Sequence, residues 1–218
     1  MLIAEELLLL ALDDETGKET IRKSELVPAL GGALVAELVL LERVGLTPRD
    51  AGWRQRGRIT VTSVKPTDDP ELDLMLERLT EREGKKLENA FSEASVGRSL
   101  TKDLLPRLLE RLARAGALAP RHEKVLGLLP RTTWRTADVA VEDDVRQRLQ
   151  SALVDGLTPT ERTVALIALL QVTGLIGKVV HAEDKTAVRR RAAEFAEGDG
   201  VAAAVKQAID TAAAATAG

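Results

Sequence analysis

The pattern of hydrophobic and polar residues changes character in the segment 158–180, where polar positions become rare. Seven apolar residues follow one another at 164–170, so at 3.6 residues per turn they face every direction around a helix. Such a helix is buried in a protein or in a bilayer. Gln171, Thr173 and Gly174 end the run well short of the roughly 20 residues that span a membrane. The pattern predicts a core helix that other helices surround.

The start of this core helix is predicted from its polar residues. Thr158 is suited to be the N-cap, and Pro159 to be the first helical residue, where its missing N–H costs nothing. Glu161 would then complete a capping box. We therefore expect the helix to begin directly after Thr158.

Amphipathic patterns elsewhere predict further helices, and short alternating patterns predict a few strands. The expected strands lie at 44–46 and 58–64, and a β-hairpin is expected with arms at 117–119 and 125–134. The expected helices lie at 2–12, 24–42, 101–115, 141–157, 186–196 and 201–215. One further helix is expected to begin at residue 70, and a separate, weaker helix to end at residue 91. No long linker or internal repeat interrupts them. The prediction is a mainly α, single domain over 1–218, with amphipathic helices around a central hydrophobic helix and small β-hairpins.

The composition argues against most catalytic chemistry. The chain has no cysteine and only two histidines, so thiolate sites are excluded and a histidine-based metal site or triad is poorly supplied. The paired aspartates at 13–14, 68–69 and 143–144 lie where turns or helix starts are expected, and carboxylates there cap backbone N–H groups. We find no glycine-rich phosphate loop and no nucleophile elbow. The sequence predicts a protein that is not an enzyme and that holds no cofactor or metal.

Charge narrows the possible partners. The net charge of −3 argues against a general nucleic-acid binder, so any basic site must be a local patch. The densest basic stretch places Trp53 among arginines, and it is interpreted either as an anion-binding loop or as a solvated one. These arginines are Arg49, Arg54, Arg56 and Arg58.

The predicted hairpin carries apolar residues near its bend with basic residues beside them. One interpretation is a membrane-inserting wedge, in which the apolar residues enter the lipid interface and the basic residues meet anionic headgroups. The other is that the leucines pack on the domain itself or on a second copy of the chain. The apolar residues are Val125, Leu126, Leu128 and Leu129, and the basic ones are Arg121, Lys124, Arg131 and Arg135.

Four segments resemble, in order, the Golgi phosphoprotein 3 family, which includes the yeast vacuolar sorting protein 74. They are LIAEELLLLAL with the turn DDETG, ALGGALVAELVLLERVGL, LLERLARAGAL and TERTVALIALL. The resemblance implies amphipathic helices wrapped around one hydrophobic helix. It also implies a peripheral membrane protein that recognises phosphatidylinositol 4-phosphate, inserts an apolar hairpin tip and, in eukaryotes, retains glycosyltransferases through coat contacts. The composition, rich in alanine and arginine, is typical of a bacterial member.

The resemblance also indicates headgroup-binding positions, for which the family uses one tryptophan and three arginines. Alignment on ALGGALVAEL places Arg22 at the tryptophan position and Gly31 at one arginine position. Alignment on LLERLARAG places Lys102 and Leu105 at the other two, and Arg107 matches a nearby family arginine. The candidate headgroup residues are therefore Arg22, Lys102 and Arg107. The chain starts at the family's first helix, so its basic coat-binding extension is not expected here.

The function expected is a cytoplasmic, peripheral protein on the cytoplasmic face of a membrane. It would bind anionic phospholipid, with a phosphoinositide-like headgroup, and act as an adaptor for membrane-protein tails or as a homo-oligomer. One alternative is a winged-helix-like DNA-binding regulator, since a helix at 101–115 precedes a basic hairpin. The other is a soluble scaffold that binds protein only.

Overall fold

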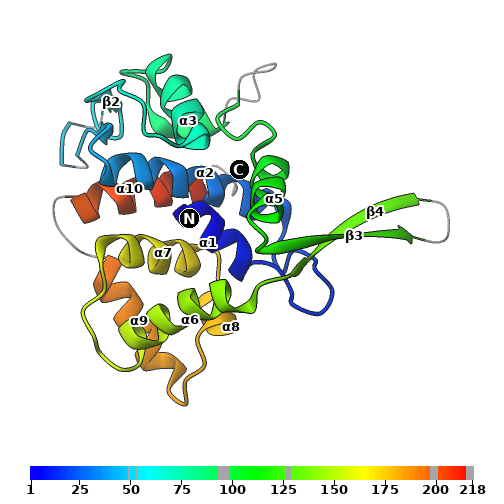
Figure 1. Ribbon diagram of the computed structural model, residues 1–218. Coiled ribbons are helices and arrows are strands. Elements are labelled where there is room, and N and C mark those ends of the chain that lie inside the picture. Colours follow the sequence, from blue (N-terminus) through cyan, green and yellow to red (C-terminus); the bar gives the residue numbers. More distant parts are fainter. Residues whose placement is uncertain (49, 53, 93–98, 126–128, 197–200, 215–218) are drawn as a thin grey trace.

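The computed structural model describes residues 1–48, 50–52, 54–92, 99–125, 129–196 and 201–214. These residues form a helical body with two small antiparallel sheets (Figure 1). The helices are α1 (Ile3–Leu10), α2 (Lys23–Leu40), α3 (Pro70–Thr80), α4 (Leu87–Ser92), α5 (Leu104–Arg114), α6 (Val139–Leu153), α7 (Glu161–Val172), α8 (Ile176–Val179), α9 (Lys185–Ala196) and α10 (Val201–Ala214). The strands are β1 (Val44–Leu46), β2 (Ile59–Val61), β3 (Leu118–Val125) and β4 (Leu129–Thr136). The mainly α prediction is confirmed.

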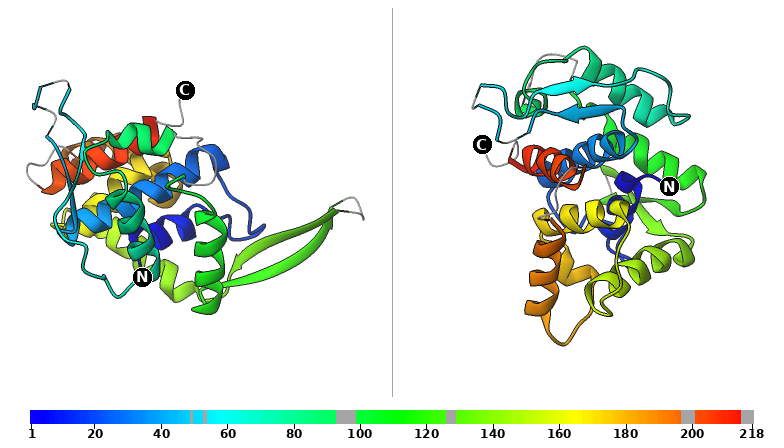
Figure 2. Two further views of the ribbon diagram at one scale, coloured as in Figure 1. Left: turned by 90° about the horizontal axis from the view of Figure 1, so that it is seen from above. Right: turned by 90° about the vertical axis from the view of Figure 1, so that its left-hand side faces the viewer.

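The predicted core helix is α7, and it is buried as expected. Residues 165–170 are buried on all sides of the helix, and Val164 is half-buried. It shares the centre with two other helices, because all eight residues of α1 and most of α2 are also buried. The helix α10 packs on both α2 and α7 (Figure 2). The centre is therefore a group of three apolar helices rather than one.

The predicted start of α7 is wrong by two residues. The N-cap is Thr160, whose hydroxyl oxygen accepts a hydrogen bond of 3.3 Å from the N–H of Thr163. Thr158 and Pro159 precede the helix. A start at Thr160 places Arg162 in the first turn, where its guanidinium pairs with Glu37 of α2. The observed start of α7 therefore goes with a contact to another helix, whereas the residues around Thr158 alone had favoured an earlier start.

Three buried carboxylates hold the start of α1 in place. Each forms an ion pair with an arginine on a different helix. Glu5 and Glu37 also accept hydrogen bonds from backbone N–H groups at the start of α1. Helix α1 is therefore tied to α5, α6 and α7 as well as to α2. The pairs are Glu5 with Arg111, Glu6 with Arg148, and Glu37 with Arg162.

The two sheets are simple hairpins. Strands β1 and β2 pair from Val44 with Val61 to Leu46 with Ile59. Strands β3 and β4 pair from Leu118 with Thr136 to Val125 with Leu129. The second hairpin was predicted, but its first arm was expected to end at residue 119. The arm continues to Val125, because β4 supplies pairing partners along its full length even where the residues of β3 are polar.

Candidate functional site

The β3–β4 hairpin, called the ribbon below, projects away from the helical body (Figures 1 and 2). Pro120, Arg121 and His122 are exposed in succession. Successive residues of a strand face opposite sides, so both faces of the ribbon are open here. Arg135 on β4 is exposed as well. A two-stranded ribbon without a covering surface is only marginally stable in water, so these open faces favour contact with a partner.

The base of the ribbon is fixed to the turn that follows α1. The N–H of Trp134 donates a hydrogen bond of 2.9 Å to the carbonyl of Gly17. Gly17 has φ +62°, and a β-carbon there would lie 2.6 Å from the carbonyl oxygen of Trp134. At the same end, the N–H of Ala137 donates to the carbonyl of Ala117 at 2.9 Å. The direction of the ribbon is therefore set by close backbone contact that only glycine permits at position 17.

The apolar residues predicted at the tip are only partly within the described structure. Leu126 and Leu128 lie outside the described residues. The backbones of Val125 and Leu129 form the last pair of the ribbon. That end of the ribbon lies away from the body in Figure 1 and in the left view of Figure 2, so its backbone is not placed against its own domain.

Two of the candidate headgroup residues, Lys102 and Arg107, lie together at the start of α5. A terminal nitrogen of Arg107 donates a hydrogen bond of 2.7 Å to the carbonyl of Lys102, whose own side chain is exposed. The Nε of Arg107 lies 3.0 Å from both carboxylate oxygens of Glu71 on α3. Arg107 is therefore already neutralised by Glu71, whereas Lys102 presents its ammonium group to solvent.

A third cation, Arg78 of α3, joins these two residues and was missed from the sequence. Its guanidinium donates a hydrogen bond of 2.8 Å to the carbonyl of Leu100, just before Lys102. Burial first, and then the nearby positive charges of Arg107 and Arg82, lower the pKa of Arg78 below its ordinary value. The carboxylates of Glu71 and Asp103 act on this pKa in the opposite direction, so both signs of charge are present at this site. We call Arg78, Lys102 and Arg107 the cationic cluster.

The remaining candidate, Arg22, is the N-cap residue of α2 and is largely exposed. Its guanidinium pairs with Glu25 of the same helix rather than with α5. Gly31 lies nine residues further, about 13 Å along the helix at 1.5 Å per residue. A β-carbon there would lie 2.6 Å from Thr101 Cγ2 and 2.7 Å from Phe91 Cε1. The position aligned with a family arginine therefore has no room for a side chain.

The other basic stretch is a loop held by its own arginine. Arg58 Nε donates a hydrogen bond of 2.8 Å to the carbonyl of Arg54, and its terminal nitrogen bonds to the carbonyl of Gly84. Arg54 and Arg56 are exposed. Arg49 and Trp53 lie outside the described residues. The structure thus gives Arg58 a role in shaping the loop.

The described part of the chain offers no group of three or more histidine, cysteine, aspartate or glutamate residues placed to hold a metal ion. Both histidines are exposed, and the Nδ1 of His122 lies 3.2 Å from the hydroxyl of Thr132 across the ribbon. Among the described helices, none combines the length and the apolar character needed to cross a bilayer.

The comparison with protein families matches this chain to Golgi phosphoprotein 3 (GPP34) over residues 3–212. The match covers nearly the whole chain, so the chain belongs to the Golgi phosphoprotein 3 family, as the four segments predicted. A comparison with curated proteins finds no match. Membership is consistent with a lipid-associated or adaptor role.

Proposed function

We propose that this member of the Golgi phosphoprotein 3 family is a non-enzymatic, peripheral membrane protein that binds anionic lipid headgroups, phosphatidylinositol 4-phosphate among them. The observation that carries the proposal is the ribbon, which leaves the body with both faces open at Pro120, Arg121 and His122. A lipid surface supplies headgroups for its basic residues and an apolar region for its tip.

The charge of the ribbon supports a lipid surface as its partner. Residues 118–136 contain four basic residues and one acidic residue, which gives +3 at neutral pH, whereas the whole chain carries −3. Each lysine or arginine near an anionic membrane contributes about 1 kcal/mol to binding. The ribbon would therefore orient an acidic protein with its basic end toward the membrane.

The cationic cluster is the proposed headgroup site. Lys102 is its main phosphate contact, because its ammonium is exposed while Arg107 is already paired with Glu71. Arg107 and Arg78 bond the carbonyls of Lys102 and Leu100 and so position this segment, and Arg78 also adds positive charge. Arg22 adds a separate, weaker contact from the start of α2.

The DNA-binding alternative is disfavoured by the surroundings of α5. Arg107 is bonded to Glu71, and Arg111 is bonded to Asp69 and Glu5. A recognition helix must offer such side chains to phosphates and bases. Here they join α5 to α3 and α1 instead. A protein partner that covers the ribbon, such as a membrane-protein tail or a second copy, is separated from lipid by the experiment below.

The test is co-sedimentation of the purified protein with phosphatidylcholine vesicles, with and without phosphatidylserine, at low salt. We expect binding only to the anionic vesicles. The variant R121Q/R135Q should bind about 30-fold more weakly, because two contacts of about 1 kcal/mol each are lost. The matched control is K185Q/R189Q, which removes the same charge from exposed residues of α9 and should bind like the wild type.

A second arm tests headgroup recognition. Phosphatidylinositol 4-phosphate is added to vesicles matched in total charge by phosphatidylserine. K102Q should lose the preference for the phosphoinositide while keeping its binding to phosphatidylserine. Absence of binding to every anionic vesicle, or equal losses in the two double variants, would contradict the proposal.

A further inference from the structure

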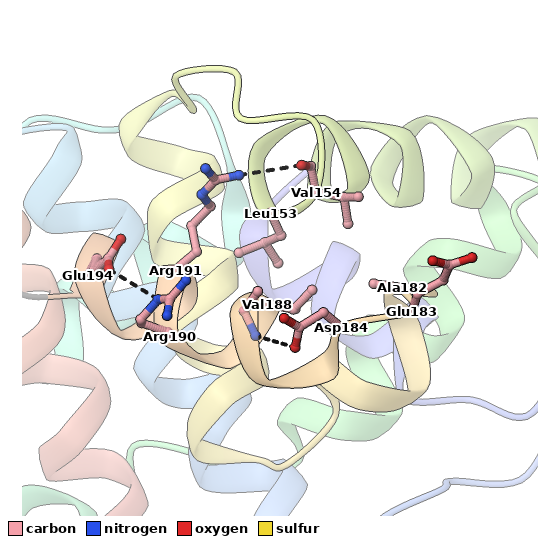
Figure 3. Close-up of a pocket in the computed structure, with 10 residues that line it drawn as sticks. Leu153, Val154, Ala182, Glu183, Asp184, Val188, Arg190, Arg191 and Glu194 are labelled. Atoms are coloured by element: carbon pink, nitrogen blue, oxygen red, sulfur yellow. Dashed lines mark hydrogen bonds and ion pairs between the residues drawn. The ribbon is translucent and has the colours of Figure 1, made fainter.

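A pocket of about 530 Å³ lies between the C-terminal end of α6 and the helix α9 (Figure 3). In Figure 1 the C-terminal end of α6 and the helix α9 lie at the lower left of the body, whereas the ribbon leaves the body on the right, so the pocket is separate from the proposed lipid-binding surface. Its volume is within the range of sites that bind small molecules.

The floor of the pocket is aliphatic. Leu153 of α6 and Val188 of α9 are buried beneath it, and Val154 at the end of α6 remains 39% exposed at its rim. Ala182 and Ala187 complete the apolar lining. Most of the apolar surface that the floor leaves open to water belongs to Val154, since Leu153 and Val188 are already almost fully buried, and a short apolar chain would cover it.

Arg191 of α9 stands at one wall of this floor (Figure 3). A terminal nitrogen donates to the carbonyl of Val154 at 3.4 Å, which is the long limit of a hydrogen bond. The guanidinium also lies against Gly156, where a β-carbon would be 3.4 Å from it. Within the described ranges no carboxylate is paired with Arg191. Its charge is permanent, and its other N–H donors are available to water or to an anionic ligand.

The acidic residues of the pocket bind partners other than Arg191 or lie at a distance from it. Asp184 accepts hydrogen bonds of 2.9 Å from the N–H groups of Thr186 and Ala187 at the start of α9. Glu194 pairs with Arg190 at 3.9 Å. Glu183 is exposed at the opposite end of the pocket (Figure 3). The pocket is thus lined by three carboxylates and two arginines, and among the described residues Arg191 is the cation beside the apolar floor that has no carboxylate partner.

We propose that this pocket binds a small anionic amphiphile. A carboxylate or phosphate-monoester head would accept hydrogen bonds from Arg191, and a short aliphatic chain would lie on Leu153, Val154 and Val188. The two parts act together, because the floor alone would accept any apolar molecule and a guanidinium alone would accept any anion.

The proposal is tested by calorimetric titration of the full-length protein with octanoate and octyl phosphate as probes. Octanol, acetate and inorganic phosphate are the comparison ligands. Each methylene that is buried should strengthen binding about fourfold, so octanoate should bind far more tightly than acetate. Saturable binding of either octyl anion, with much weaker binding of all three comparison ligands, supports the site. No saturable binding of either octyl anion, or equal binding of octanol, overturns it.

Variants locate the binding. R191M keeps the aliphatic stem, removes the charge and should weaken octanoate about tenfold or more. Its control is R189M, an exposed neighbour outside the pocket lining, which should leave affinity unchanged. V154E places a competing carboxylate beside Arg191 and should weaken binding without altering the arginine. Unchanged affinity in both R191M and V154E, or an equal loss in R189M, contradicts the proposal.

Discussion

The carboxylate of Glu37 on α2 accepts a hydrogen bond of 2.8 Å from the backbone N–H of Ile3, the first residue of α1. Its other oxygen pairs with Arg162 in the first turn of α7. The Glu37 side chain is only 7% exposed. One buried carboxylate thus joins the three central helices and satisfies an N–H group that has no partner within its own helix.

Replacing Glu37 with glutamine is expected to destabilise the fold. The amide keeps one acceptor for Ile3 but removes the nearer negative partner of Arg162, which also pairs with Glu6 at 3.8 Å. We expect a cost of about 2 kcal/mol, because the arginine is partly exposed. Urea unfolding measures the difference. E25Q, on the same helix, is the control: its partner Arg22 is exposed, so its midpoint should not move. Equal effects of the two changes would contradict this role of Glu37.

Replacing Gly31 with alanine tests the close packing of α2 against Phe91 and Thr101. The added methyl group would overlap both side chains, so we expect a loss of about 1–3 kcal/mol. Gly177 is also helical, but no atom lies within 4 Å of a β-carbon there. G177A should therefore leave stability unchanged or raise it by up to about 1 kcal/mol. Thermal unfolding of both variants decides the point.

The ion pair of Asp69 with Arg111 should make the stability of the fold depend on pH. Burial alone would raise the pKa of Asp69, but the bonds and charge of Arg111, with the N–H groups of Glu71 and Leu72, lower it below its ordinary value. A carboxylate with a lowered pKa stabilises the fold above its unfolded pKa of about 3.9, and this contribution disappears as pH falls through the folded value. D69N keeps a capping oxygen, so it mainly removes charge.

The stability difference between wild type and D69N should therefore be largest at neutral pH and should shrink below about pH 4. Denaturant unfolding at several pH values measures it. A difference that stays constant down to acidic pH would show that the Asp69 charge is not responsible.

Gly17 anchors the ribbon. Comparing G17A with G116A separates two contributions to the loss of stability, the left-handed φ and the contact with the Trp134 backbone. The left-handed φ alone costs about 1–2 kcal/mol, and contact with the Trp134 backbone adds to it. Gly116 has φ +79° with no atom within 4 Å of a β-carbon, so G116A incurs the first cost only. G17A should be the more destabilising in urea unfolding, and it should also weaken binding to anionic vesicles. Equal losses would mean that the Trp134 contact relaxes freely.

The sequence by itself determined the elements that depend on neighbouring residues. The run 164–170 is apolar on every side of a helix, and only burial could accommodate it, so the centre of α7 was predictable. The start of α3 was also predictable from neighbouring residues, since Asp69 is suited to be an N-cap and Pro70 to be a first helical residue in any surroundings. The second hairpin was predicted too, from a segment with apolar residues near its bend and basic residues beside them.

Only the tertiary structure decided how far β3 extends, where α7 begins and which cations lie together. Residues 121–124 are polar and show no alternation of apolar residues, so their strand conformation depends on pairing with β4. Arg78 reaches Leu100 across 22 residues, and Arg107 reaches Glu71 across 36. Such contacts form when helices pack against one another. The hydrophobic periodicity of each segment predicts a helix, but it does not predict which polar faces of different helices come into contact.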